Sequence, residues 1–227
     1  MNKKLRSRNK KVACSRWKSV HNKEEVYIKN NHIPYLKARI FGFIAGDGNI
    51  SVRESKKGKK HHVLRFYPDH ESLIESLNNA FLKIYNRMPI TKKDKNFYIL
   101  KIYSKPIVLD MLSYARFGTY DWDIPSFVKS RKSKIEWLRA FFDAESYVGP
   151  NHIKLHSVNK VGLIKIQSIL LNDFKIESKF YSYKPKNPKH STQYILMIIS
   201  KAMRKKYLEE IGFNHKLKRD KLLKYLS

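Results

Sequence analysis

Residues 40–48 (IFGFIAGDG) and 138–146 (LRAFFDAES) repeat one pattern, and this pattern decides the fold. Each stretch is an apolar run that ends in a carboxylate, Asp47 or Glu145, and each carries small residues four positions apart: Gly42 and Gly46, Ala140 and Ala144. Residues four apart lie on one face of a helix, and small residues on such a face let two helices approach closely. The pattern therefore predicts two tightly packed helices with their carboxylates together at one end.

The remainder of the chain repeats in the same order. Residues 98–105 (YILKIYSK) match residues 194–201 (YILMIISK) at six of eight positions. Alternating apolar residues predict strands, and three-to-four-residue periodicity predicts helices. The first half is expected to contain a helix at 34–47, strands at 49–54 and 62–67, a helix capped by Asp69, strands at 89–93 and 97–103, and a helix at 105–115. The second half is expected to contain a hairpin at 147–156, a helix at 159–174, strands at 176–183 and 193–199, and a helix from 201. The sequence thus predicts two αββαββα repeats.

Composition favours a folded protein that binds a polyanion. The chain of 227 residues carries a formal charge of +29, which favours DNA or RNA as a partner. No apolar run is long enough to span a membrane, and no basic amphipathic helix stands apart from the core pattern. Cys14 is the only cysteine, so neither a disulfide framework nor a thiolate zinc site is expected. The basic N-terminus has no apolar segment behind it, and we therefore expect an intracellular protein, in a cytoplasm, nucleoid or organelle.

The paired stretches resemble the signature helices of the LAGLIDADG homing endonucleases in their single-chain, two-repeat form. The resemblance extends to residues 124–128 (IPSFV) and 211–213 (IGF) and covers roughly residues 34–227. It implies an α+β fold in which two pseudo-symmetric halves form a saddle over DNA and join at the paired helices. The expected divisions are a basic N-terminal arm (1–33), the first repeat (34–115), a linker (116–130) and the second repeat with a C-terminal basic helix (131–227).

The two carboxylates are the predicted catalytic centre. A carboxylate at a helix C-terminus is disfavoured by the helix dipole, so a matched pair there calls for a compensating cation. A divalent metal would supply that cation and support phosphodiester hydrolysis. By resemblance, Mg²⁺ or Mn²⁺ would be bound by Asp47 and Glu145, with Gly46 and Ala144 completing the site. Asp143 has Ala45 as its counterpart in the first copy and is interpreted as structural.

The polar strand faces are the predicted DNA-reading surface, because their long polar and cationic side chains can reach base edges in the major groove. An ordinary solvated sheet face is the competing interpretation. The predicted DNA-binding residues are Arg53, Lys56, Lys57, Lys59, Lys60, Arg65, Lys101, Lys105, Lys154, Lys160, Gln193 and Lys201. Residues 1–23 hold nine Lys or Arg and no acid, and are expected either to be a solvated tail or to follow DNA phosphates, with Trp17 as an anchor to the body.

The sequence also departs from the family pattern. Family members often carry Gln or Lys where the second strand meets its helix, whereas this chain has Pro68 and Asp69, or Ser157 and Val158. Three functions therefore remain open. The first is a monomeric homing endonuclease that cleaves double-stranded DNA at a long asymmetric target in intron homing. The second is a splicing maturase that binds intron RNA, and the third is a DNA-binding protein without nuclease activity.

Overall fold

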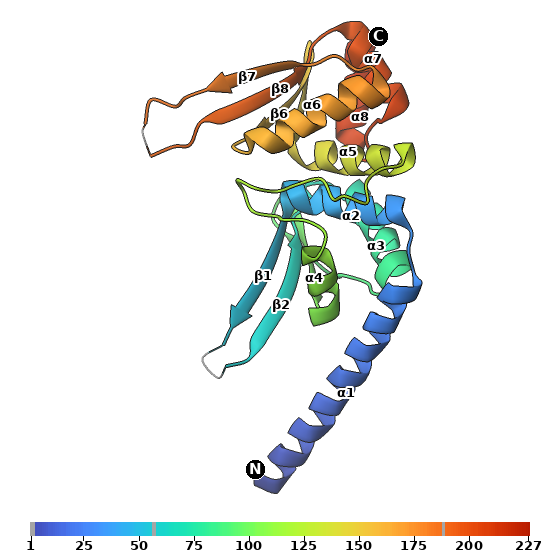
Figure 1. The fold of residues 1–227 in the computed structure, drawn as a ribbon, viewed down its shortest axis with the longest axis vertical. Coiled ribbons are helices and arrows are strands. Elements are labelled where there is room, and N and C mark those ends of the chain that lie inside the picture. The colour runs from blue at the N-terminus through green and yellow to red at the C-terminus, as the bar shows by residue number, and fades with distance from the viewer. Residues whose placement is uncertain (1–2, 56–57, 188) are drawn as a thin grey trace.

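The computed structural model describes residues 3–55, 58–187 and 189–227, without the side chains of residues 3–11 and 13. An N-terminal helix, α1 (Lys3–Asn30), precedes two similar halves (Figure 1). The first half comprises α2 (Pro34–Asp47), β1 (Gly48–Glu54), β2 (Lys60–Phe66), α3 (Ser72–Tyr85), β3 (Ile90–Asp94), β4 (Phe97–Tyr103) and α4 (Lys105–Leu112). The second comprises α5 (Arg131–Glu145), β5 (Ser146–Gly149), β6 (His152–Ser157), α6 (Lys160–Phe174), β7 (Lys179–Tyr183), β8 (Gln193–Ile198), α7 (Lys201–Glu210) and α8 (Lys216–Leu226).

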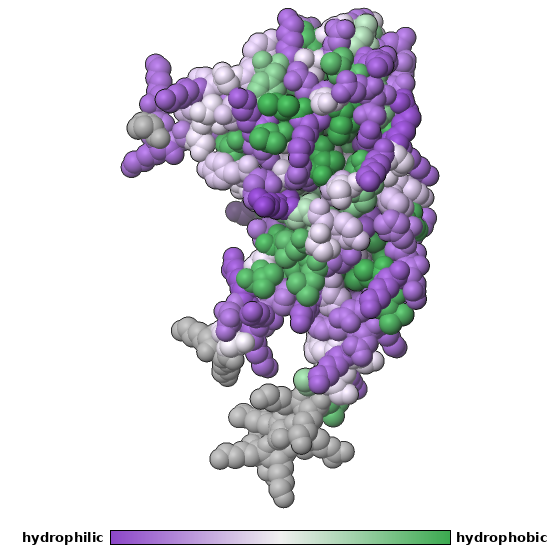
Figure 2. Space-filling view, viewed as in Figure 1, coloured by the Kyte–Doolittle hydropathy of each residue, from purple (hydrophilic) through white to green (hydrophobic). Residues whose placement is uncertain are grey.

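The two halves share one sheet topology. Each contains a four-stranded antiparallel sheet, in the orders β1-β2-β4-β3 and β5-β6-β8-β7. The predicted duplication of αββαββα is therefore confirmed, and the fold class is α+β. Strand pairs from both sheets project toward the same side of the molecule (Figure 1), and hydrophilic side chains gather on these projecting arms (Figure 2).

The halves meet at α2 and α5, whose backbones touch. A Cβ atom built on Gly42 would overlap the carbonyl oxygen of Trp137, and one built on Gly46 would lie 2.6 Å from the Cβ of Ala144. A partly buried ion pair joins the same two helices, because Arg39 contacts Glu136 at 2.7 Å. The closeness of the backbones explains why the sequence places small residues along these faces.

Several predicted boundaries shift, and one local prediction is wrong. The helix α4 ends at Leu112 rather than near residue 115, and β7 begins at Lys179 rather than residue 176. Asp69 does not cap α3, because that helix begins at Ser72 with Glu71 at its N-cap. The side chain of Asp69 instead lies 3.1 Å from His215, which comes from the far end of the chain. A long-range contact therefore replaces the expected local one.

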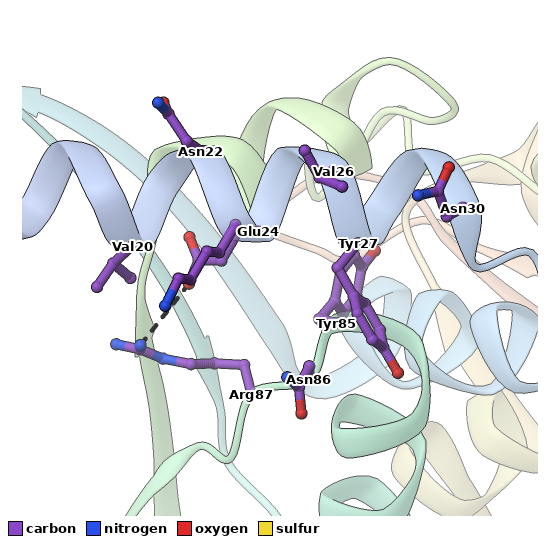
Figure 3. Close-up of a pocket in the computed structure, with 10 residues that line it drawn as sticks. Val20, Asn22, Glu24, Val26, Tyr27, Asn30, Tyr85, Asn86 and Arg87 are labelled. Carbon is purple, nitrogen blue, oxygen red and sulfur yellow. Dashed lines mark ion pairs between the residues drawn. The ribbon is translucent and has the colours of Figure 1, made fainter.

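The N-terminal segment, for which the sequence predicts either a tail or an arm, forms the helix α1. The C-terminal half of α1 packs on the first repeat (Figure 3). Buried Glu24 accepts a hydrogen bond from Ser104 and lies 3.7 Å from Arg87. The side chains of Tyr27 and Asn31 donate to the carbonyl of Lys83. Trp17, expected to anchor the segment, is about half exposed, so the attachment lies further along the chain.

Among the described residues, none of the helices combines the length and apolar character needed to cross a lipid bilayer.

Candidate catalytic and nucleic-acid-binding site

The candidate catalytic centre lies where α2 and α5 end side by side. Asp47 is the last residue of α2 and Glu145 is the last residue of α5, and both are partly buried. A Cβ atom on Gly46 would lie 3.1 Å from the Cγ of Glu145. The close packing of the helices therefore brings the Glu145 side chain against the last turn of α2, next to Asp47.

Burial in a negatively charged environment keeps both carboxyls from ionising readily. Burial raises the pKa of Asp47 to about 6; Lys218 opposes this shift, and the charge of Asp69 adds to it. Burial also raises the pKa of Glu145 to about 7, with the charge of Asp47 as the second cause and Lys218 again opposing. An added cation would favour the ionised form of both groups.

Lys218, on α8, supplies a positive charge to this centre. Its ammonium donates hydrogen bonds to three carbonyls at the C-terminus of α5, those of Phe142, Asp143 and Ala144. The carbonyl of Phe142 also accepts from Ser146, whereas those of Asp143 and Ala144 are groups that a helix end leaves without intrahelical partners. Burial lowers the pKa of Lys218, and the neighbouring carboxylates, led by Asp69, act in the opposite direction. Lys218 thus satisfies the end of α5 and offsets part of the negative charge of the centre.

Two further contacts hold the C-terminal segment against the centre. Asp143 is buried and accepts hydrogen bonds from the backbone N–H groups of Asn214 and His215, at 3.2 and 2.9 Å. The ring of His215 is buried and reaches Asp69 of the first repeat. The structural role that the sequence gives to Asp143 agrees with these contacts, and the segment that carries Lys218 is positioned by both repeats.

The other side of the centre is a polar cavity of about 260 Å³. Glu145 and Gly46 line it, together with Gly118 from the linker and with His156 and Gln193 from the second sheet. The linker is fixed there because Asn159 donates to the carbonyl of Trp122 at 2.6 Å. The two sides of the carboxylate pair therefore differ: one presents Asp69, His215 and Lys218, and the other presents a cavity without a lysine among its described lining residues.

The donor set at this centre fits a hard divalent cation. Mg²⁺ prefers oxygen ligands and commonly binds one or two protein carboxylates, leaving its other positions to water and substrate phosphates. Asp47 and Glu145 provide two carboxylates. The carbonyl oxygen of Ala144 accepts a hydrogen bond from the Lys218 ammonium at 3.2 Å, which uses one of its two lone pairs. Within residues 3–55, 58–187 and 189–227, no group of three or more His, Cys, Asp or Glu side chains could hold a metal by itself. Phosphate and water would therefore complete the coordination.

One face of each sheet carries the central residues of the predicted DNA-reading surface. Arg65 pairs with Lys101 across β2 and β4, on the face opposite buried Leu64 and Ile102. In the second sheet, Lys154 pairs with Met197, and Gln193 lies on the same side of β8 as Met197. We call this surface, defined by Arg65, Lys101, Lys154 and Gln193, the saddle face.

The structure distributes the other predicted DNA-binding residues over different places. Arg53 and Lys60 lie at the far end of the β1–β2 hairpin, beside the exposed turn residue Lys59. Lys105, Lys160 and Lys201 are the exposed first residues of α4, α6 and α7, and are not on the saddle face. The predictions for Lys56 and Lys57 lie outside the described residues.

Sequence reasoning missed Asp69 and His215 as neighbours of the centre and gave Lys218 no role. They are brought to Asp47 by tertiary packing, and Asp69 and His215 are 146 positions apart. One weak signal was present: Lys218 follows the 211–213 motif that the resemblance singled out.

The second repeat matches a known domain family. Residues 132–212, which begin in α5 and include the second sheet, match the LAGLIDADG-like domain family. The match shows a LAGLIDADG-like domain in the second repeat, and the first repeat lies outside it. The first repeat has the same strand order and packs against the LAGLIDADG-like domain through an equivalent helix.

Solved structures share this fold over most of the chain. I-DmoI, in complex with DNA and Mn, is 17% identical with a TM-score of 0.61, and the match covers 80% of this chain and 98% of that one. I-WcaI, a homing endonuclease bound to its DNA recognition sequence, is 14% identical with a TM-score of 0.52, covering 82% and 85%. Full-length WhiA from Thermotoga maritima is 16% identical with a TM-score of 0.53, covering 91% and 66%.

Curated relatives match a similar length of sequence. A glutamine–fructose-6-phosphate aminotransferase of Methanocaldococcus jannaschii is 28% identical over 192 residues, which are 81% of this chain and 17% of that protein. A probable translation initiation factor IF-2 of the same organism is 27% identical over 169 residues, 68% of this chain and 14% of that protein. The chain thus spans less than a fifth of the length of these relatives.

Proposed function

We propose that this protein is a site-specific endonuclease that cleaves double-stranded DNA with a divalent cation, Mg²⁺ or Mn²⁺, and acts in intron homing as a monomer. The observation that carries the proposal is the carboxylate pair Asp47 and Glu145, which lies between two sheets whose saddle faces carry cationic residues. The structural neighbour I-DmoI in complex with DNA and Mn supports the same function.

Different residues of the chain would position the DNA duplex and hold the cation. Arg65, Lys101 and Lys154 would position the duplex by meeting its phosphates and base edges. Asp47 and Glu145, with Gly46 and Ala144, would hold the cation against the scissile phosphates. A bound divalent cation supplies Lewis-acid chemistry to phosphodiester hydrolysis.

The curated relatives support mobility of the encoding element. An aminotransferase and an initiation factor have different activities, yet both contain a stretch that resembles this chain. Because the two relatives have unrelated activities, the stretch that they share with this chain is independent of either activity. Such a distribution is expected when one mobile coding unit is inserted into different host genes.

Sequencing of cut DNA ends tests the proposal and locates the target in the same experiment. Genomic DNA of the source organism, and of a related strain without the element, would be incubated with the protein in Mg²⁺, Ca²⁺ or chelator, and the new ends sequenced. We expect new DNA ends at a single site with a long recognition sequence. These ends should appear only in Mg²⁺ and should be absent with Asp47→Asn or Glu145→Gln. Each variant should retain duplex affinity within about tenfold, because phosphate contacts dominate affinity. Cleavage that survives both substitutions would refute the assigned centre.

A non-cleaving role is the second candidate, as an RNA-binding maturase or a DNA-binding protein. It is favoured by buried Pro68, which stands where family members often carry Gln or Lys, and by Asp69, which is engaged with His215. Tight binding of duplex or intron RNA without any new DNA ends in Mg²⁺ would select this candidate.

A further inference from the structure

A groove of about 800 Å³ lies between α1 and the end of the first sheet, away from the carboxylate centre. One wall is α1, with Trp17, Lys18 and His21, and the other includes His62 of β2 and Tyr103 of β4. We call this feature the α1 groove. The α1 helix packs on α4 and α3, whose buried side chains cover the Leu64 side of the sheet. The α1 wall and His62 are therefore on the Leu64 side of the sheet, whereas Tyr103, two residues after Lys101 on β4, lines the groove from the Lys101 side at the end of the sheet.

The α1 groove is cationic: none of its described lining residues is acidic, and among its cations Arg87 pairs with Glu24 next to the groove. Burial lowers the pKa of His62, and positive neighbours lower it further: Lys105, Lys60, His21 and His61. The N-terminus of α4 at Ser104 is already occupied by the buried carboxylate of Glu24, so the cations left for a ligand are the exposed lysines Lys18, Lys60 and Lys105. Several positive groups thus converge on one concave surface, as an anionic ligand requires.

Aromatic rings line the same groove. Trp17 and Tyr103 are 49% and 44% exposed, and the Trp17 ring lies 5.8 Å from that of His21. Flat exposed rings beside cations are the arrangement by which proteins stack unpaired bases and track the connecting phosphates. A duplex offers the phosphates but keeps its base faces stacked within the helix, so the rings would have no partner.

We propose that the α1 groove binds unpaired nucleotides of a nucleic acid strand, with Trp17 and Tyr103 stacking on bases and Lys18, Lys60 and Lys105 meeting phosphates. The Trp17 wall of this site belongs to α1 and not to the saddle face, and binding there does not depend on DNA cleavage.

Trp17 provides a direct optical test. The other two tryptophans, Trp122 and Trp137, are buried, at 5% and 1% exposure, so ligand-induced quenching of the exposed indole reports on the α1 groove. The full chain in chelator would be titrated with 12-nucleotide oligo(dT) and oligo(U). In the wild-type protein we expect saturable quenching of tryptophan fluorescence. The Trp17→Phe variant, which lacks the exposed indole, should show no such quenching. Stronger binding of oligo(U) identifies RNA as the source and stronger binding of oligo(dT) identifies DNA; either result supports the site.

Affinity is measured separately, by anisotropy of a labelled oligonucleotide. Trp17→Ala should weaken binding about 5- to 150-fold, the range for loss of one base stack, and Trp17→Phe should recover most of it. Lys18→Gln should weaken binding and reduce its salt dependence, whereas Lys29→Gln, an exposed lysine of α1 outside the groove, should do neither. Equal effects of the two lysine changes would overturn the proposal.

A duplex competitor separates this proposal from the function of the saddle face. A 30-base-pair duplex should leave the Trp17 signal of bound oligonucleotide in place, and Trp17→Ala should leave duplex affinity unchanged. If the duplex displaces the oligonucleotide and Trp17→Ala weakens both ligands alike, the groove is an extension of the duplex site and the proposal fails. Absence of DNA cleavage would count against the proposed nuclease and not against this site.

Discussion

At the scale of single residues, Asp47 and Glu145 make stability depend on pH. Their raised pKa values, about 6 and about 7, lie above the ordinary 3.8 and 4.5. The folded state therefore binds more protons than the unfolded state between these limits, and stability falls as pH rises from about 4 to about 7. At about 1.4 kcal/mol per pKa unit, the cost above that range is about 3 kcal/mol for Asp47 and slightly more for Glu145.

The corresponding prediction concerns the double variant Asp47→Asn with Glu145→Gln. In chelator it should melt above the wild-type protein at pH 8 and together with it near pH 4. Added Mg²⁺ should raise the wild-type melting temperature and not that of the variant, because only the wild type has the carboxylates to bind it. Glu25→Gln, at an exposed position of α1, is the control. A constant difference at all pH values would contradict the raised pKa values.

Lys218 gives a second prediction. Its ammonium lowers the pKa of Asp47 and Glu145 and donates to the end of α5. Lys218→Met should therefore raise both carboxyl pKa values further, as measured by NMR titration of the carboxyl carbons in chelator. It should also reduce stability by about 1–3 kcal/mol, because buried acceptors lose their donor. Lys216→Met, exposed on the same helix, should change neither quantity. Unshifted carboxyl titrations would remove Lys218 from the centre.

The sequence could predict the two carboxylates because a repeated pattern places them at equivalent helix ends. It could not predict their neighbours, because Asp69, His215 and Lys218 belong to no shared local pattern. They meet only when the C-terminal segment crosses to the first repeat, where Asp143 and Asp69 hold it. Contacts of this range depend on the folded packing of both halves.

At the scale of secondary-structure elements, the α2–α5 pair distinguishes two kinds of close contact. A methyl group on Gly46 would meet the Ala144 side chain, whereas one on Gly42 would overlap backbone at Trp137. Gly46→Ala should therefore be rescued by Ala144→Gly, and Gly42→Ala should not be rescued by Ala140→Gly. Each single glycine change should cost about 1–3 kcal/mol. Denaturant melts of the single and double variants test this prediction, and equal rescue at both positions would contradict it.

Element order could be predicted because the periodicities of strand and helix appear twice along the chain. Whether the N-terminal segment is a solvated tail or an ordered helix could not be predicted, because its basic composition is compatible with both. Its attachment depends on Glu24 meeting Ser104 and Arg87, contacts that span up to 80 positions. The same buried contact converts a basic segment into a wall of the α1 groove.

At the scale of the whole molecule, the first hairpins of the two halves differ in length, and the second half projects its β7–β8 pair instead (Figure 1). The hairpin strands β1 and β2 have seven residues each, whereas β5 has four. Three residues of strand correspond to about 10 Å, which is about three base pairs of duplex. We therefore expect the β1–β2 hairpin to protect about three base pairs more of its half-site than the β5–β6 hairpin protects of the other, in a protein that sediments as a monomer. Arg53→Ala should weaken protection only at the outer edge of that half-site, and Lys154→Ala only in the other half. A symmetric footprint would refute the argument.

The unequal hairpins also give the molecule a direction. A protein with two identical halves would sit on its target in two equivalent orientations and could not tell the upstream flank from the downstream one. In the proposed function the longer β1–β2 hairpin would engage only one flank, so each encounter with DNA would be either correctly or wrongly oriented. The duplication therefore supplies the architecture, and the difference between the hairpins would supply polarity along the DNA.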